Sequence, residues 1–326
     1  MTFLKSLLAT ALVTVGMGGA IALPVRAHSN ESHNSTSVQA EEGVKFEVIP
    51  VRGNIYVIAG TNGAGNIGVV TGEIGPILID SQVPGVTNDL QTVILNAFNR
   101  RPGMLINTHW HFDHTGGNAA LGETGLTIVA HENARVRMAA GQVIESLNRT
   151  IPPAPEIALP AVTFTDSMTF HVNDEVIEAF HVRNAHTDGD IVIHFKNSDV
   201  IHMGDLVFNG LYPFIDVSSG GSINGMIAGV DQILEIASND TKLIPGHGPL
   251  LTRAELVDYR TMLITVRDRM AAAIAKGKTL EQVLGMNINA DYDETLGNVF
   301  LSPEQFATIL YNDLSRDDLS RDDLPQ

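Results

Sequence analysis

The chain has 326 residues and a formal net charge of −17, and it contains no cysteine. This length can bury the core of one large domain or of two small ones. The lack of cysteine excludes disulfides, thiolate ligands and thiolate nucleophiles, and the negative charge argues against a nucleic-acid partner.

The first 27 residues have the pattern of a secretory signal peptide. Lys5 precedes an apolar run over residues 7–23, and Val25-Arg26-Ala27 ends it with small residues at the positions that a signal peptidase reads. An uncleaved membrane anchor is the alternative, because the run approaches spanning length. Its glycines and Pro24 make it a poor anchor. We therefore expect cleavage after Ala27 and a periplasmic or secreted protein without a stable membrane anchor.

The pattern along the rest of the chain predicts a single α/β domain over residues 44–314, between a flexible lead-in at 28–43 and a charged tail at 315–326. In the first half we expect strands at 45–49, 55–58, 67–70, 77–79, 104–107 and 127–130 and a helix at 85–99. In the second half we expect strands at 168–172, 176–182, 191–195 and 200–203 and helices at 221–236, 253–276, 280–284 and 303–314. This repeated order predicts two βα halves in one sandwich.

Gly63, Gly65 and Gly68 have the spacing of a dinucleotide-binding fingerprint. That fingerprint requires a helix directly after the glycines, whereas a predicted strand begins at Ile67. The glycines are therefore interpreted as a turn between two strands.

Residues 108–117 read THWHFDHTGG, directly after a short apolar run, and contain the pattern H-x-H-x-D-H. His109 and His111 are two apart on an extended segment, so both can reach one ion, and Asp113 and His114 can turn toward a second. Zinc favours imidazole and carboxylate ligands. A loose His-rich tract is the alternative, but it does not explain the spacing.

Three further candidate ligands lie where a strand or an apolar run meets a loop: His186 in NAHTDGD, Asp205 in IHMGD and His247 in IPGHGP. Rigid strand ends suit a preorganised site. The other histidines are expected to be packing or surface residues, with His181 the one closest to being an exception: His28, His33, His131, His171, His181, His194 and His202.

These motifs, in this order, resemble the metallo-β-lactamase superfamily over roughly residues 45–250. The resemblance implies an αββα four-layer sandwich with a dinuclear metal site, usually zinc, at one edge of the sheets. It implies one metal held by His109, His111 and His186 and a second held by Asp113, His114 and His247, with Asp205 between them. Asp80, which ends its strand, matches a position that supports the ligands from behind.

The function that the resemblance implies is hydrolysis with two Zn²⁺ ions, in preference to iron or manganese. A hydroxide shared by the metals would attack a small acyl substrate, and Asp113 would orient it or move its proton. Export makes a β-lactam-like cyclic amide the leading substrate, with weak β-lactamase activity and a link to antibiotic resistance. A lactone, ester or thioester is the alternative. An iron-dependent persulfide oxygenase and a non-catalytic metal-binding protein are further alternatives.

Two positions depart from the lactamase subclass that has a cysteine ligand. Asp205 replaces that cysteine, and Phe208 replaces a lysine that binds the substrate carboxylate. A charge-assisted hydrogen bond contributes about 1.5–3 kcal/mol, so we expect poor saturation with β-lactams and equal or better hydrolysis of uncharged esters or lactones. Phe208 and Tyr212 lie in an apolar run that either lines the substrate pocket or packs as a structural loop. The sequence does not predict the oligomeric state.

Overall fold

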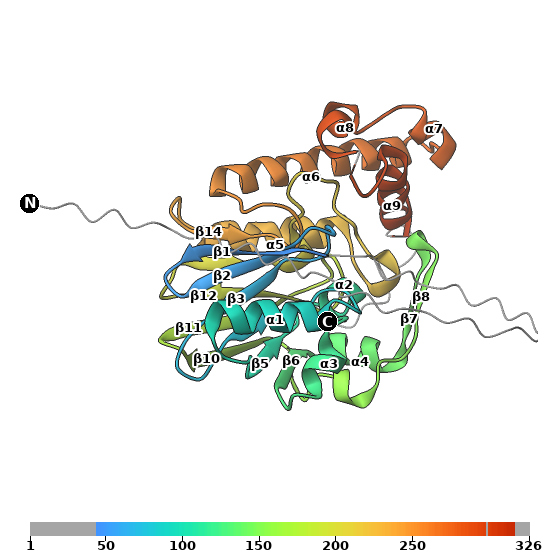
Figure 1. Ribbon diagram of the computed structural model, residues 1–326. Helices are drawn as coiled ribbons and strands as arrows, with labels where there is room; N and C mark the ends of the chain where they lie inside the picture. The colour runs from blue at the N-terminus through green and yellow to red at the C-terminus, as the bar shows by residue number, and fades with distance from the viewer. Residues whose placement is uncertain (1–43, 298, 317–326) are drawn as a thin grey trace, which may run out of the picture.

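The computed structural model describes residues 44–297 and 299–316 (Figure 1). The predicted signal peptide, the lead-in and most of the charged tail lie outside these residues. Two main sheets are present, with strand orders β1-β2-β3-β4-β5-β6-β9 and β10-β11-β12-β13-β14, and β7 and β8 form a separate pair. Among the described residues, no helix has the length and apolar character that a membrane span requires.

The first sheet and its connections contain these elements: β1 (Phe46–Arg52), β2 (Ile55–Gly60), β3 (Ile67–Val70), β4 (Ile77–Ile79), α1 (Thr87–Phe98), β5 (Met104–Ile106), α2 (Phe112–Thr115), α3 (Asn118–Gly122), β6 (Thr127–His131), α4 (Glu132–Ala140), β7 (Gln142–Ile144), β8 (Arg149–Ile151) and β9 (Val162–Phe164). The second half contains these: β10 (Ser167–Val172), β11 (Glu175–Val182), β12 (Asp190–Phe195), β13 (Val200–His202), the 3₁₀ turns η3 (Gly204–Leu206) and η4 (Val217–Ser219), α5 (Ile223–Ile236), β14 (Lys242–Ile244), α6 (Arg253–Ala275), α7 (Leu280–Leu284), α8 (Ala290–Leu296) and α9 (Pro303–Arg316).

Three apolar clusters separate four layers and confirm the αββα sandwich (Figure 1). One cluster fills the space between the sheets, where Ile106 and Val129 of the first sheet meet Ile193 of the second. A second cluster packs α1 and α3 on the outer face of the first sheet. A third packs α5 and α6 on the outer face of the second sheet. Because both faces of β3 and β4 are covered, these strands are buried throughout.

The predicted strands and helices are present, with shifts of a few residues at their ends. The glycine run at 63–68 leads directly into β3 at Ile67 and is a turn between β2 and β3, as the sequence predicted. The sequence analysis missed α2, α3, α4, the β7–β8 hairpin, β9, β14 and α8, which are short or lack a clear apolar period. Helix α9 continues to Arg316, two residues into the segment that we predicted as a charged tail.

Candidate metal centre

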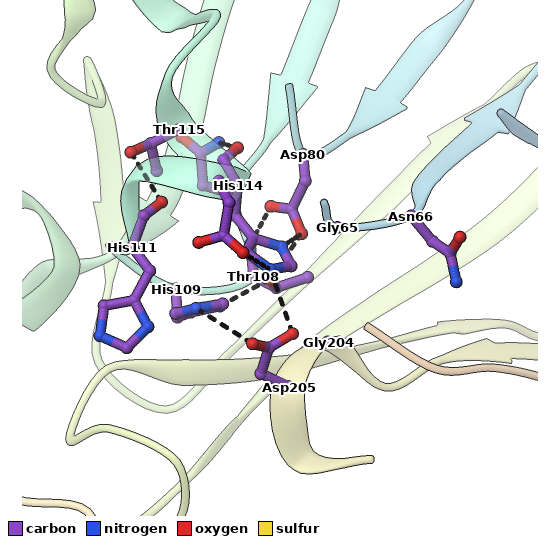
Figure 2. Close-up of polar contacts among 12 residues, drawn as sticks. Gly65, Asn66, Asp80, Thr108, His109, His111, His114, Thr115, Gly204 and Asp205 are labelled. Carbon is purple, nitrogen blue, oxygen red and sulfur yellow. Dashed lines mark hydrogen bonds and ion pairs between the residues drawn. The ribbon is translucent and has the colours of Figure 1, made fainter. Parts of the chain in front are cut away.

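The seven candidate ligands lie at one end of the two sheets, after the strand ends that carry them. His109, His111, Asp113 and His114 follow β5 and enter α2, and Asp205 in η3 follows β13. His186 lies between β11 and β12, and His247 follows β14. Because β4 and β5 are parallel, and β13 and β14 are parallel, their carboxyl ends meet at one edge. Figure 2 shows Asp205 facing His109 and His114 from the opposite sheet.

The side chains form two groups, and within each group one ligand atom per residue lies within 4.8 Å of the others. The first group is His109, His111, His186 and Asp205, and the second is Asp113, His114 and His247. The Asp205 carboxylate lies between the groups, at 3.5 Å from His186 Nε2, 3.1 Å from His114 Nε2 and 3.4 Å from His247 Nε2. This division matches the one that the resemblance implied, including the central place of Asp205.

The hydrogen bonds of the first group assign its histidine tautomers. His111 Nε2 donates to Asp216 at 2.9 Å, and His186 Nδ1 donates to the carbonyl oxygen of Phe214 at 2.7 Å. Since a carboxylate and a carbonyl only accept, the other two nitrogens, His111 Nδ1 and His186 Nε2, carry lone pairs in the neutral rings. These nitrogens face each other at 2.8 Å. Two lone pairs at that distance require a cation or a proton between them.

The same rule holds for the remaining histidines. His114 Nδ1 donates to Asp80 at 2.8 Å, and His247 Nδ1 donates to the carbonyl oxygen of Gly63 at 3.0 Å. Their Nε2 atoms face each other at 3.3 Å. His109 Nδ1 lies 3.1 Å from the Thr108 hydroxyl, which itself donates to Asp80, and His109 Nε2 is buried without a hydrogen-bond partner. All five inward nitrogens are therefore free to bind a metal ion.

Burial and neighbouring charges shift the pKa values of four site histidines, downward for two in the first group and upward for two in the second. Burial and the neighbouring histidines hold the pKa of His109 well below its usual value, and burial lowers the pKa of His186 to about 4. Burial also disfavours charged His114 and His247, but the nearby carboxylates outweigh it. They raise the pKa of His114 well above its usual value and that of His247 to about 10. The second group thus attracts positive charge, which a metal ion would supply in place of protons.

Two glycines allow the backbone to approach the ligands closely. A Cβ atom on Gly65 would lie 2.4 Å from the His114 ring, and one on Gly246 would lie 1.9 Å from Asp205 Oδ1. Gly65 belongs to the glycine turn before β3, so this turn forms one wall of the site. The sequence analysis assigned it no such role. The turn is held in this position by a hydrogen bond, in which the Gln82 amide donates to the Gly65 carbonyl oxygen at 2.7 Å.

Asp80 lies behind the ligands, as the resemblance implied. It accepts from the Thr108 backbone at 2.7 Å and from the Thr108 hydroxyl at 2.6 Å, and it also binds His114 (Figure 2). Its backbone is left-handed, with φ of 68°, which turns the carboxylate toward Thr108 and His114 at the end of β4. Asp80 therefore orients His109 through Thr108 and His114 directly.

Asp216 is a site residue that the sequence analysis missed. It is fully buried, binds His111 and accepts hydrogen bonds from Ser218 and from the backbone of Ser219. Burial would raise its pKa, but the contact with His111 and the two serines hold the pKa well below its usual value. The sequence feature that could have indicated Asp216 is its position as an acidic residue at the end of the apolar run that contains Phe214.

Replacing Asp216 with asparagine should weaken metal binding about tenfold to a hundredfold, because loss of such an outer carboxylate costs about that much affinity. The neutral amide no longer favours the His111 tautomer with a free Nδ1. Metal dissociation constants from chelator competition would measure the effect. Asp231→Asn, which removes a surface carboxylate paired with Arg260, is the matched control and should leave the constants unchanged. Equal metal affinity in wild type and Asp216→Asn would contradict this role.

The two candidate substrate contacts are buried in the packing of the protein, whereas His181 packs on another histidine, as the sequence predicted. Phe208 is buried and stacks on the His247 ring at 5.2 Å between centroids, so it packs behind a ligand. Tyr212 is fully buried, stacks on Phe306, and donates to Asp293 at 2.7 Å. The Tyr212 ring therefore belongs to the packing of α9 and is not accessible to a substrate. His181 stacks on His131, away from the seven ligands.

Comparison with known proteins identifies the family. A family model described as "Metallo-beta-lactamase superfamily" matches residues 60–261, which is more than half of the chain. The chain belongs to this superfamily. The matched residues include all seven candidate ligands.

Two curated relatives of this superfamily member differ in activity. The human acyl-coenzyme A thioesterase MBLAC2 is 26% identical over 165 residues, which cover 45% of this chain and 57% of the relative. The metallo-beta-lactamase type 2 of Bacillus cereus is 25% identical over 245 residues, which cover 70% of this chain and 90% of the relative. The chain thus spans little more than half the length of the thioesterase.

Solved structures agree on the fold. The sec-alkylsulfatase Pisa1 from Pseudomonas sp. superimposes with a TM-score of 0.62 and 16% identity, covering 86% of this chain and 52% of that chain. At this identity the likeness concerns the fold alone.

Proposed function

We propose that the protein is a dinuclear zinc hydrolase that cleaves a small acyl compound. The observation that carries this proposal is the orientation of the five site histidines. Each one donates its outer N–H to a fixed acceptor and turns a free nitrogen inward, next to the carboxylates of Asp113 and Asp205. Neutral imidazole and carboxylate are the donors that zinc favours in catalytic sites.

One ion would be held by His109, His111 and His186 and the other by Asp113, His114 and His247, with Asp205 between them. Zinc bound there would act as a Lewis acid on the substrate carbonyl and would lower the pKa of a water molecule. The chain's own contribution is to fix the histidines through Asp80 and Asp216 and to exclude water behind them. The buried rings of Trp110 and Phe214, which pack against His111, close that side of the site.

Asp113 has the most open carboxylate of the set, with 20% of its side chain exposed. Burial would raise its pKa, but His114 and His247 outweigh this and hold the pKa well below its usual value. The ionised carboxylate lies 3.3 Å from His247 Nε2. Asp113 is therefore placed to accept a hydrogen bond from the attacking water and to take up its proton.

The acyl group is proposed from the relatives. A β-lactam-like cyclic amide remains the leading substrate, because type 2 metallo-beta-lactamases are among the relatives. A thioester is the second candidate, because acyl-coenzyme A thioesterases are also among them. Position 208 carries a buried phenylalanine, so it supplies no cation for a substrate carboxylate.

A panel of β-lactams, lactones, thioesters and phosphodiesters, tested on purified zinc-loaded protein, would examine this function. We expect turnover of at least one acyl class and none of the phosphodiesters. Asp113→Asn should reduce kcat/KM about a hundredfold or more, since general-base groups contribute about 10²–10⁴-fold. Metal analysis should find two zinc equivalents per chain. No acyl turnover by protein that holds two zinc equivalents would reject the proposed hydrolase.

Export is proposed on the pattern of residues 1–27 alone. N-terminal sequencing of the protein from its native cells should begin near His28, and a sequence that begins at Met1 would reject cleavage.

A further inference from the structure

Arg149 is the first residue of β8, in the hairpin that β7 and β8 form. Its guanidinium carbon lies 3.5 Å from the centroid of the Phe112 ring. Phe112 is the first residue of α2 and stands in the chain between His111 and Asp113. Figure 1 shows the hairpin at the same end of the sandwich as α2. The stack therefore places a cation beside the candidate metal centre.

The centre is most open next to this stack. Asp113 has 20% of its side chain exposed and His247 has 11%, whereas His109, His114, His186 and Asp205 have 4% or less. Phe112, which precedes Asp113, is itself partly exposed. A substrate that reaches the ligands from this side would pass Arg149.

The hairpin that carries Arg149 is tied to the rest of the site. Arg316 of α9 lies 3.8 Å from Glu145 in the hairpin and donates to the carbonyl oxygen of Val217 in η4 at 3.2 Å. Leu147 and Ile151 of the hairpin pack against the core. Because η4 directly follows Asp216, these contacts connect the hairpin to a segment of the candidate site.

The N–H donors of Arg149 have no acceptor within the described part of the chain. The side chain is exposed, and its one contact there is the Phe112 ring. Eight other arginines pair with carboxylates: Arg52, Arg135, Arg137, Arg183, Arg260, Arg267, Arg269 and Arg316. Of the remaining described arginines, Arg100 and Arg253 donate to carbonyl oxygens and Arg101 also has no carboxylate partner. What distinguishes Arg149 is its contact with Phe112, between two candidate ligands in the chain.

The contact with Phe112 holds the Arg149 side chain on the ring but gives its N–H groups no hydrogen-bond acceptor. An exposed cation–π contact contributes only about 0.5–1 kcal/mol. The Arg149 guanidinium carbon contacts the face of the ring, and the exposed N–H groups of a guanidinium form a planar fork that matches a carboxylate or a phosphate. Such a group on the substrate would complete the hydrogen bonding of Arg149.

We propose that Arg149 binds an anionic group of the substrate at the rim of the metal centre, and that the substrate is therefore an acyl compound with a carboxylate or a phosphate. The inference rests on the proposed function. It differs from the expectation of uncharged substrates that followed from Phe208, because it takes the cation from the β7–β8 hairpin and not from position 208.

Thiol probes test the proposal without turnover, because a thiolate binds zinc. Mercaptoacetate, 3-mercaptopropionate and 6-mercaptohexanoate would each be compared with the corresponding amide, by calorimetry on zinc-loaded full-length protein. In wild type at least one acid should bind about tenfold or more tightly than its amide, the effect of one charge-assisted hydrogen bond. Arg149→Gln should remove this preference, and Arg149→Lys should keep part of it.

Arg101→Gln is the matched control, because Arg101 is exposed and precedes β5 at the end opposite His109. It should keep the full preference. Equal binding of every acid and its amide to wild type, or a preference that survives in Arg149→Gln, would overturn the role of Arg149. If neither acids nor amides bind, the proposed zinc site itself is wrong, and the inference that rests on it is rejected with it.

Two substrate pairs would show whether the anion lies on the leaving group or on the acyl side. Acetyl-coenzyme A carries phosphates on the leaving group, and acetyl-pantetheine lacks them. A 4-nitrophenyl succinate monoester carries a carboxylate on the acyl side, and 4-nitrophenyl butyrate does not. Arg149→Gln should raise KM about tenfold for the anionic member of one pair, with little change in kcat and no change for the neutral member. Equal changes for both members of each pair would indicate a structural role and overturn the proposal.

Discussion

An Asp205→Asn variant is expected to lose most of its bound metal at both positions and at least about a hundredfold in kcat/KM. The Asp205 carboxylate lies within 3.5 Å of His186 in the first group and of His114 and His247 in the second, and it is 4% exposed. Burial would raise its pKa, but His114, His247 and His109 together hold the pKa well below its usual value, so the carboxylate is ionised. Removing one partner of a buried charge pair costs about 3–5 kcal/mol, which is a hundredfold to several thousandfold in affinity.

Metal content by plasma emission and kcat/KM on the best substrate of the panel would measure this loss. Asp258→Asn is the matched control, because Asp258 is exposed on α6 and this variant removes the same charge from a residue that contacts none of the candidate ligands. It should retain two equivalents and full activity. Circular dichroism would verify that Asp205→Asn is folded. A folded Asp205→Asn protein with two zinc equivalents would show that this carboxylate does not hold the metals.

Removing metal from the wild-type protein should lower its melting temperature by about 10–20 °C. A ligand that binds only the folded state adds about 2.7 kcal/mol at a free concentration one hundredfold above its Kd, so two sites add about 5 kcal/mol. For a domain of this size, each kcal/mol moves Tm by about 2–4 °C. The physical cause is the buried cluster itself, where facing lone pairs and like carboxylates are left without a cation.

Calorimetric scans with zinc at that concentration, and after chelation and dialysis, would give the two temperatures. The Asp205→Asn protein should respond to chelation by a few degrees at most, because its sites are already weakened. The same Tm for zinc-loaded and chelated wild type would contradict a dinuclear site built from these residues.

Much of the candidate site was predictable because its signals are local. H-x-H-x-D-H places four candidate ligands within six residues, and each remaining ligand stands where an apolar strand run gives way to a loop. Strands that are buried on both faces leave strong apolar runs, so the two sheets were also predictable. The β7–β8 hairpin was not, because its strands have three residues each and are largely exposed.

The sequence by itself determined the residue types of the candidate ligands, their order and the strand ends that carry them. Only the tertiary structure decided which nitrogen of the site histidines turns inward, since the partners that set it are distant in the chain for all of them except His109, whose partner is Thr108. His111 and Asp216 are 105 residues apart, and Gly63 and His247 are 184 apart. It also decided that Tyr212 is buried and that Arg149 lies on Phe112. Periodicity and spacing encode the direction of a side chain within its own element, whereas these contacts depend on how the sheets and the hairpin pack together.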